Sequence, residues 1–289
     1  MRLFILVAPN TEDRRSITRW TTGELPLEGL RSSSSPVHHE LNFSLQIARI
    51  GSLGKNMCEG EYESLKALHA VSPTLAPQPY TVGDVFRFIP SKADSVSFQW
   101  GRHQRKEPEM YFVLCEFREV GEQPPDPIKF MARLAELHRN SVSPTGKFGF
   151  HITTCHNWIT QATNFWDDSW EVVFREQLSH MVDLDKEASG EWPKFHRVCN
   201  LILEKVVPRL LRPLQSDGRK IRPCLIHGDL WDEKTATDME TGEPFMFDAA
   251  SFYAHNEYEM GNWRGHRYKL SNKIFIKHYK RHFPVSEPG

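Results

Sequence analysis

CLIHGDLWDEKTATDMETGEPFMFDAASFYAHNEYEMGN, residues 224–262, contains two carboxylates that each follow a short apolar run, Asp229 and Asp248. Between them, Thr241 and Gly242 form a turn signal of the kind that joins two strands of a β-hairpin. A hairpin of this length brings the two ends of the segment back to one place. We therefore expect both carboxylates to lie at the same cleft.

Two carboxylates at one cleft suit phosphoryl transfer. One accepts the proton of the attacking hydroxyl group, and the other holds a metal ion that bridges the phosphates. Asp229 is the predicted catalytic base and Asp248 the predicted metal ligand. In kinase catalytic loops an Asn five positions after the base binds a second metal ion, and that position is Lys234 here. Lys234 either turns away from the metal ion or contacts the phosphate oxygens of the nucleotide itself, which makes it a candidate cofactor-binding residue. A lone His-Gly-Asp can also be a simple loop turn, and the second Asp favours chemistry.

The same region resembles the fructosamine kinase family, whose members carry HGDLWxxN followed by D-x-x-S-F-Y-x-H-x-E-x-E-x-G. In this chain the two motifs read HGDLW and DAASFYAHNEYEMG. The resemblance continues upstream through GEYESLKALHAVSP (60–73), YFVLCEF (111–117), LAELHRNSVSPTGKFGFHITT (134–154) and WEVVFREQL (170–178). It covers about residues 40–289, so the chain is identified as similar to protein-ribulosamine 3-kinases along most of its length.

The resemblance implies an α+β, two-lobed protein-kinase-like fold of the aminoglycoside-phosphotransferase type. We expect a small nucleotide-binding lobe with an antiparallel sheet at residues 41–118, and a larger, mainly helical catalytic lobe at residues 119–289. Residues 1–40 resemble the family little, and the carboxyl end stops before the family's last helices. We therefore expect a diverged and truncated member.

The resemblance also implies a reaction, the ATP-dependent phosphorylation of the 3-hydroxyl group of ketosamines. Its substrate class is the ribulosamine and fructosamine adducts on lysines of glycated proteins, or small ketosamines. ATP and Mg²⁺ are the implied cosubstrate and metal ion.

Composition narrows the class of protein without choosing among enzymes. The 36 basic and 37 acidic residues leave a net charge of −1, so no nucleic-acid partner is expected. The five cysteines are an odd number without paired spacing, which favours reduced thiols and a cytoplasmic location. No run of about 18 apolar residues occurs, so no membrane span is expected. A chain of 289 residues is long enough for two lobes.

The small lobe of a kinase carries a Lys on a strand and a Glu on the next helix, and both serve the phosphates. Glu61 is the predicted Glu, with Glu63 or a merely solvated helix face as the alternatives. In the strand predicted at residues 43–48, the family's Lys position holds Gln46, which can donate a hydrogen bond but has no charge. Residues 20–27 contain one Gly and are a poor match to a glycine-rich phosphate turn.

The apolar run at residues 111–117 is predicted to lead into the linker whose backbone holds adenine, with Glu116, Phe117 and Arg118 as the contact residues; an ordinary buried strand end is the alternative. Further candidates face the substrate sugar or build the catalytic loop. Trp231 is either a platform for the sugar or a core residue. Gln161 and Asn164 either orient substrate hydroxyl groups or serve as helix-capping surface residues.

Glu259 is predicted to hydrogen-bond the backbone amides of the catalytic loop, as the family resemblance implies. Upstream, His151, Cys155 and His156 could suggest a metal site, but they lack a second pair at ligand spacing.

Two alternatives to an active kinase remain open. The first is a catalytically impaired pseudokinase, supported by Gln46, Lys234, the missing phosphate turn and the short carboxyl end. The second is a metal-dependent hydrolase built on His227, Asp229, Asp248 and His255, which the residue types permit and the upstream resemblance does not favour.

Overall fold

The structure is a computed structural model that describes residues 3–7, 20–23, 43–49, 51–84, 110–121, 123–265 and 268–287. For the strands before residue 50, only the backbone is described. The side chain of Gln46 and residues 24–27 of the segment weighed as a phosphate turn therefore lie outside the described part.

The amino-terminal part of the fold is a five-stranded sheet in the order β2-β1-β3-β5-β4. The strands are β1 (Leu3–Val7), β2 (Trp20–Gly23), β3 (Phe43–Arg49), β4 (Pro79–Asp84) and β5 (Met110–Glu116). β1 runs parallel to β3, and the other three neighbouring pairs are antiparallel, as predicted for the small lobe. Residues 1–40 thus contribute two strands to the sheet.

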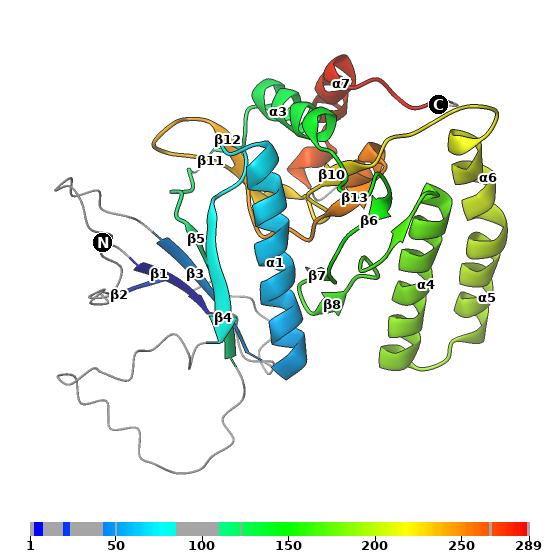
Figure 1. Ribbon diagram of the computed structural model, residues 1–289, viewed down its shortest axis with the longest axis horizontal. Helices are drawn as coiled ribbons and strands as arrows, with labels where there is room; N and C mark the ends of the chain where they lie inside the picture. The colour runs from blue at the N-terminus through cyan, green and yellow to red at the C-terminus, as the bar shows by residue number, and fades with distance from the viewer. Residues whose placement is uncertain are drawn as a thin grey trace, which may run out of the picture.

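Helix α1 (Gly51–Val71) lies between this sheet and the rest of the molecule (Figure 1). Its Cys58 packs with Val113 of β5 in a small core under the sheet. Its Leu68 belongs instead to the large core of the carboxyl-terminal part. One helix therefore joins two apolar cores, and burial on both sides fixes its position between the lobes.

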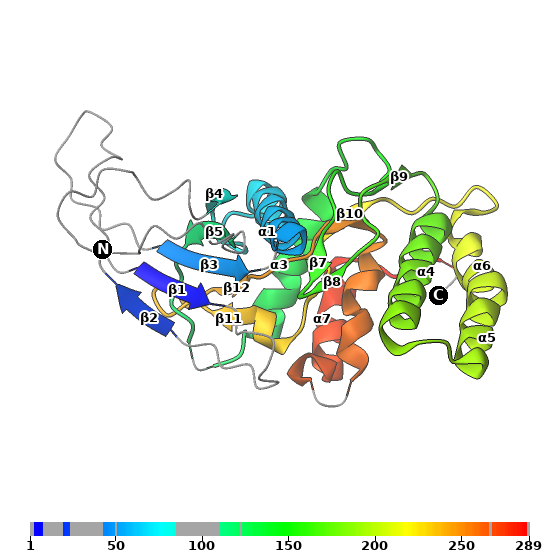
Figure 2. The same ribbon diagram turned by 90° about the horizontal axis from the view of Figure 1, so that it is seen from below.

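The carboxyl-terminal part is mainly helical. Its helices are α3 (Pro127–Asn140), α4 (Trp170–Ser189), α5 (Pro193–Leu201), α6 (Val207–Leu211) and α7 (Lys273–His282). A π-helical turn, Ile202–Val206, joins α5 to α6. Both views place α4–α6 at the end of the molecule opposite the β1–β5 sheet (Figures 1 and 2). The described helices include none that is long and apolar enough to cross a membrane.

Short strands hold the loops of this lobe. The first sheet has the order β10-β13-β6-β9, formed by Cys224–Ile226, Phe252–Ala254, Phe148–Gly149 and Trp166–Asp167. Two hairpins add to it, β7 (Cys155–His156) with β8 (Ile159–Thr160) and β11 (Thr235–Thr237) with β12 (Pro244–Met246). The second hairpin is the one predicted from the turn signal at Gly242, whose φ is +69°.

The two parts meet at a linker. β5 ends at Glu116 and α3 begins at Pro127, so the change from sheet to helices falls between these residues. Gly121 donates its N–H to the carbonyl of Thr237, which ties the linker to the end of β11 at 2.8 Å. The domain boundaries at residues 40/41 and 118/119 stay predictions. The five cysteines, all of which the structure describes, form no disulfide with one another.

Helix α3 shows how local sequence sets an element. Asp126 accepts hydrogen bonds from the N–H groups of Ile128 and Lys129, and Pro127 takes the first helical position, where no N–H is needed. Met131, Leu134 and Leu137 lie buried on one face, as their spacing predicts.

Replacing this cap tests the local argument. Asp126→Ala should lower the free energy of unfolding by about 1 kcal/mol, because two N–H groups at the helix start lose their acceptor. Chemical denaturation measures the change, with Glu136→Ala, an exposed site on the same helix, as the control. Equal stability of the two variants would show that the cap contributes nothing.

Candidate active site

The catalytic loop begins where β10 ends, with His227, Gly228 and Asp229. Gly228 has a φ of +84°, and a Cβ atom there would lie 2.2 Å from the carbonyl oxygen of Ala250. Only glycine allows this close approach at that φ. The loop is therefore pressed against the segment that follows Asp248, and Asp229 at its tip stays partly exposed.

The buried imidazole of His227 joins the two carboxylate-bearing segments. Its Nε2 lies 2.9 Å from the carbonyl oxygen of Phe247, and its Nδ1 lies 3.3 Å from the backbone nitrogen of Asp229. Nε2 therefore donates to Phe247 while Nδ1 accepts from Asp229, which assigns a neutral tautomer. Burial lowers the pKa of His227 further, so it stays neutral.

A buried carboxylate, that of Glu259, holds the catalytic loop from behind. Its two oxygens accept hydrogen bonds from the backbone N–H groups of His227 at 2.5 Å and Gly228 at 3.1 Å. The predicted contact between Glu259 and the loop amides is thus confirmed. The ring of His138 lies 3.5 Å from the same carboxylate. Burial alone would raise the pKa of Glu259. The interactions of its carboxylate with His138 and His227, which include the hydrogen bond from the His227 backbone, have the larger effect, so the pKa is lowered.

Asp248 lies in the turn directly after β12 and has a φ of +56°, a left-handed conformation that is uncommon outside glycine. The turn is held on both sides. Ala250 donates its N–H to the carbonyl of His227 at 2.9 Å, and Ser251 donates its N–H to the Ser64 hydroxyl of α1 at 2.9 Å. Such strain persists only where its surroundings impose it, and it is common at functional sites.

The hairpin register then sets which side chain meets Asp248. Thr235 of β11 pairs with Met246 of β12, so Lys234 lies opposite Phe247, and Phe247 donates its N–H to the Lys234 carbonyl at 3.1 Å. The Lys234 ammonium forms an ion pair with Oδ2 of Asp248. The Lys234 side chain is 17% exposed and that of Asp248 is 41% exposed, so the pair is partly open to solvent.

Further acidic groups surround this lysine. Burial lowers the pKa of Lys234, while the charges of Asp229, Glu61 and Glu233 act in the opposite direction. Burial raises the pKa of Glu61 to about 7, and Lys234 opposes that rise. Glu61, the predicted helix Glu, therefore lies close enough to Lys234 for their charges to interact.

A two-metal arrangement does not fit these residues. The position of the second metal's ligand is an ammonium group, and two unit charges at ~4 Å repel by about 4 kcal/mol at an effective dielectric of ~20, about twice that for a divalent ion. Asp232, next to the loop, accepts hydrogen bonds from the N–H groups of Lys269 and Leu270 and so points elsewhere. The carboxylate of Asp248 is a ligand type that Mg²⁺ prefers, and a single divalent cation at Asp248 stays a prediction.

The linker residues have a mixed role. Arg118 donates to the carbonyls of Pro73 and Thr74 and pairs with Glu116 at 2.9 Å, so both side chains fasten the linker to the turn after α1. Glu116 and Phe117 line a pocket of about 360 Å³ together with Arg118. A contact with adenine at these three residues stays a prediction that rests on backbone groups.

The other predicted residues lie at different depths. The backbone of Gln46 is in β3, paired with Val113 of β5. Trp231 is partly buried, and the centroid of its ring lies 5.6 Å from that of the Tyr268 ring. Gln161 is buried and donates to the carbonyl of Ala250 at 3.1 Å, whereas Asn164 is exposed. Their roles toward the substrate stay predictions.

The hydrolase alternative finds no support in the site. His227 is engaged by Phe247, and His255 contacts Ser286 at 2.7 Å. In the described part of the chain, no group of three or more His, Cys, Asp or Glu side chains could hold a metal ion. His151, Cys155 and His156 form no such group either.

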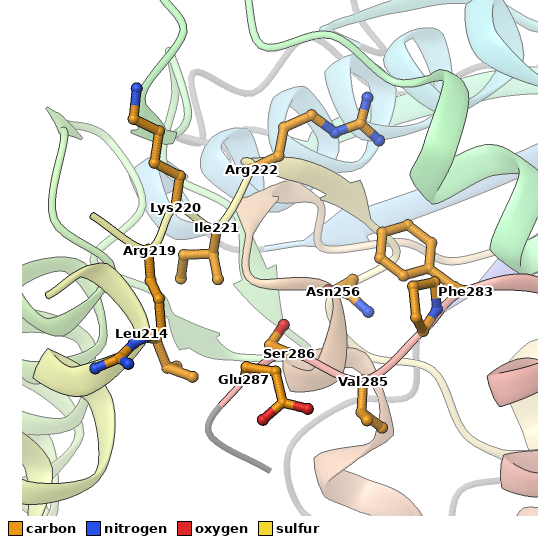
Figure 3. A pocket seen from close by; sticks show the side chains of 11 residues that line it. Leu214, Arg219, Lys220, Ile221, Arg222, Asn256, Phe283, Val285, Ser286 and Glu287 are labelled. Carbon is orange, nitrogen blue, oxygen red and sulfur yellow. The ribbon is translucent and has the colours of Figure 1, made fainter. Parts of the chain in front are cut away.

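A separate pocket of about 360 Å³ lies at the carboxyl end, between Arg222 and residues 283–287 (Figure 3). The charged ends of Lys220 and Arg222 point away from it, while Ile221 and Ser286 face it. It therefore has no converging cations for a phosphate, and it is distinct from the cleft at Asp229.

A sequence profile described as fructosamine kinase matches residues 38–288. The chain belongs to the fructosamine kinase family. It is 29% identical over 212 residues to the chloroplastic protein-ribulosamine 3-kinase of Oryza sativa subsp. indica, which is 73% of this chain and 53% of the rice protein. It is 29% identical over 219 residues to the ketosamine-3-kinase of Mus musculus, which is 71% of this chain and 64% of the mouse protein.

The chain thus spans about half the length of its plant relatives in the family. A crystal structure of a candidate fructosamine-3-kinase from Haemophilus somnus superposes with a TM-score of 0.58 at 20% identity, covering 84% of this chain and 69% of that one. At this identity the likeness concerns the fold. It confirms the predicted two-lobed, kinase-like fold of the family.

Sequence reasoning missed two residues of the site. Ser64 holds the turn after Asp248 from α1, and His156 of β7 lies 2.8 Å from the Gly228 carbonyl with its Nε2. Ser64 follows Glu61 by three positions, so the helical period could have put it on the same face. No local signal brings His156 to the loop, because that contact depends on how the β7–β8 hairpin folds over.

The Glu259 contact can be tested by stability. Glu259→Gln should lower the free energy of unfolding by about 2 kcal/mol at pH 7, because two N–H groups lose a charged acceptor. The lowered pKa of Glu259 means that its stabilisation is present above the ordinary pKa of 4.5 and is lost as the pH falls through the folded-state value. The difference in unfolding free energy between wild type and Glu259→Gln should therefore become smaller below pH 4.5.

Chemical denaturation at pH 7 and at pH 4 measures this difference. Glu204→Gln, at an exposed carboxylate on the π-helical turn, is the control and should change stability little at either pH. A difference for Glu259→Gln that stays constant with pH would contradict the charged role of this carboxylate.

Proposed function

We propose that this chain transfers the γ-phosphoryl group of ATP to the 3-hydroxyl group of a ketosamine. The observation that carries the proposal is that Asp229 and Asp248 both interact with the same side chain, that of Lys234. His227 and the hairpin register hold them in place in a member of the fructosamine kinase family.

The substrate class follows from the relatives that support the proposal. The rice and mouse proteins are named a ribulosamine 3-kinase and a ketosamine-3-kinase. We take ketosamines on glycated proteins, and small ketosamines, as the substrates of this chain. We also propose a cytoplasmic location, because the five cysteines are an odd number without paired spacing; the plant relatives are named as chloroplastic.

Asp229 acts as the base in this proposal. It accepts the proton of the 3-hydroxyl group while the hydroxyl oxygen forms its bond to the γ-phosphorus and the bond from that phosphorus to the bridging oxygen of ADP breaks. Asp229 suits this role because its carboxyl is partly exposed while its backbone is tied to His227. Trp231 would then lie beside the sugar, next to the attacking group.

The nucleotide would lie between the β1–β5 sheet and the β11–β12 hairpin. The linker backbone at Glu116, Phe117 and Arg118 would meet adenine, and Glu61 and Gln46 would face the phosphates from the small lobe. Asp248 would hold one Mg²⁺ ion, which supplies charge neutralisation at the phosphate oxygens.

Turnover by variants tests the proposal. Asp229→Asn should lower kcat for ATP-dependent phosphorylation of a ribulosamine-modified lysine by at least about 100-fold, because an amide cannot accept the proton. Nucleotide affinity should be kept. ADP release coupled to phosphate incorporation into the substrate measures the change, with fructosamine-modified lysine run in parallel.

The matched control is Asp183→Asn, an exposed position on α4, which should turn over at the wild-type rate. Equal turnover by wild type and Asp229→Asn would remove Asp229 as the base. Nucleotide binding by a wild-type protein without turnover on either substrate would favour the impaired pseudokinase. Turnover that Asp248→Ala abolishes would exclude that alternative.

A further inference from the structure

A lysine lies among several acidic side chains. The Lys234 ammonium pairs with Asp248, and the charges of Asp229, Glu61 and Glu233 act on it as well. Glu233 is exposed and Asp229, Glu61 and Asp248 are partly buried, so the lysine is a cation shared by these carboxylates. A buried cation is costly unless opposite charges surround it, and here they do.

The backbone holds this lysine in place. Its N–H donates to the carbonyl of Trp231 at 2.9 Å, and its own carbonyl accepts from Phe247 at 3.1 Å. The side chain therefore starts from a fixed point between the catalytic loop and the turn of Asp248. Only its flexible stem needs to rotate for the ammonium to move from the Asp248 carboxylate to another anion nearby.

A polyphosphate entering this site would meet several carboxylates. Anionic phosphates need cations to lie beside them, and kinase sites supply these as metal ions and as a small-lobe lysine. In this chain the strand position of that lysine is the uncharged Gln46, and the position of the second metal's ligand is Lys234. Compared with the kinase pattern, this site therefore lacks the small-lobe lysine and the second metal ion, and it has the Lys234 ammonium in addition.

We propose that the Lys234 ammonium takes the place of one of the two divalent cations and binds the nucleotide's phosphate oxygens directly. The ammonium offers three donors for phosphate oxygens. The chain then binds nucleotide without a divalent ion. The ion pair with Asp248 is the resting position of the lysine in this proposal, and phosphate oxygens replace Oδ2 as its partner. This inference rests on the proposed function, because it assumes that a nucleotide enters this site.

The opposite role makes the opposite prediction. If Lys234 only blocks Asp248, the lysine excludes the metal and the phosphates together. Its removal would then strengthen nucleotide binding, whereas removal of a phosphate-binding cation weakens it. Binding affinity, measured with and without metal, therefore separates the two roles independently of turnover.

The experiment titrates a fluorescent ATP analogue, methylanthraniloyl-ATP, into the protein. One titration is done in excess EDTA and a second in about 5 mM Mg²⁺. The metal ion is in roughly tenfold excess over the probe, so that a metal site would be close to saturation. Lys234→Met keeps the length of the side chain and removes the charge. It should weaken binding at least tenfold in EDTA.

Two further variants define the role of the charge. Lys234→Arg keeps a cation and should retain most of the affinity in EDTA. Lys234→Asn supplies the amide that a second metal ion takes as a ligand, so it should bind weakly in EDTA and recover in Mg²⁺. Lys194→Met, an exposed lysine on α5 at the opposite end of the molecule, is the matched control and should bind as wild type does.

The outcomes separate this inference from the proposed function. Equal or tighter binding by Lys234→Met, relative to wild type, overturns the inference and leaves the proposed kinase standing. The same holds if wild type binds the probe only in Mg²⁺. A wild-type protein that binds no nucleotide in either buffer overturns both. Thermal unfolding midpoints confirm that each variant is folded. If Lys234→Met does not fold, the difference in EDTA binding affinity between Lys234→Arg and Lys234→Asn tests the inference instead.

Discussion

The site depends on one buried carboxylate that accepts two backbone hydrogen bonds. Glu259 binds the N–H groups of His227 and Gly228, and these residues precede the proposed base directly. An unpaired N–H group in the interior is costly, so the carboxylate specifies the path of the loop as well as stabilising it. His138 on α3 supplies the compensating contact, which links the loop to the helical core.

The second constraint is the hairpin between the two carboxylates. Its register sets Lys234 opposite Phe247, and the His227 ring bonds to the carbonyl of the same Phe247. The catalytic loop and the turn of Asp248 are therefore joined by hydrogen bonds through His227. Ser64 adds α1 to this network, which connects the helix carrying Glu61 to the catalytic residues.

Charge balance is the feature of this site on which its chemistry depends. The motif that this chain resembles implies an Asn where Lys234 stands, and the structure brings this lysine into contact with the proposed metal ligand. A single substitution thereby changes the local electrostatics by a full unit of charge, while the backbone scaffold of His227 and Glu259 is kept. Fold and chemistry can diverge separately because different residues carry them.

The amino-acid sequence by itself determined the two carboxylate positions, the hairpin that joins them and the family. These features depend on residues close in the chain, or on motifs whose spacing is local. Glu259 was also accessible, because it lies in the same motif as Asp248. The sequence likewise identified Lys234 as the departure from the family pattern, without deciding where its side chain points.

Only the tertiary structure decided that Lys234 pairs with Asp248, that Arg118 fastens the linker to the turn after α1, and that Ser64 and His156 support the loops of the site. Each of these contacts joins segments whose relative placement follows from packing of the whole chain. Hydrogen bonds and ion pairs act over a few ångströms, so they form only after apolar burial has brought distant segments together.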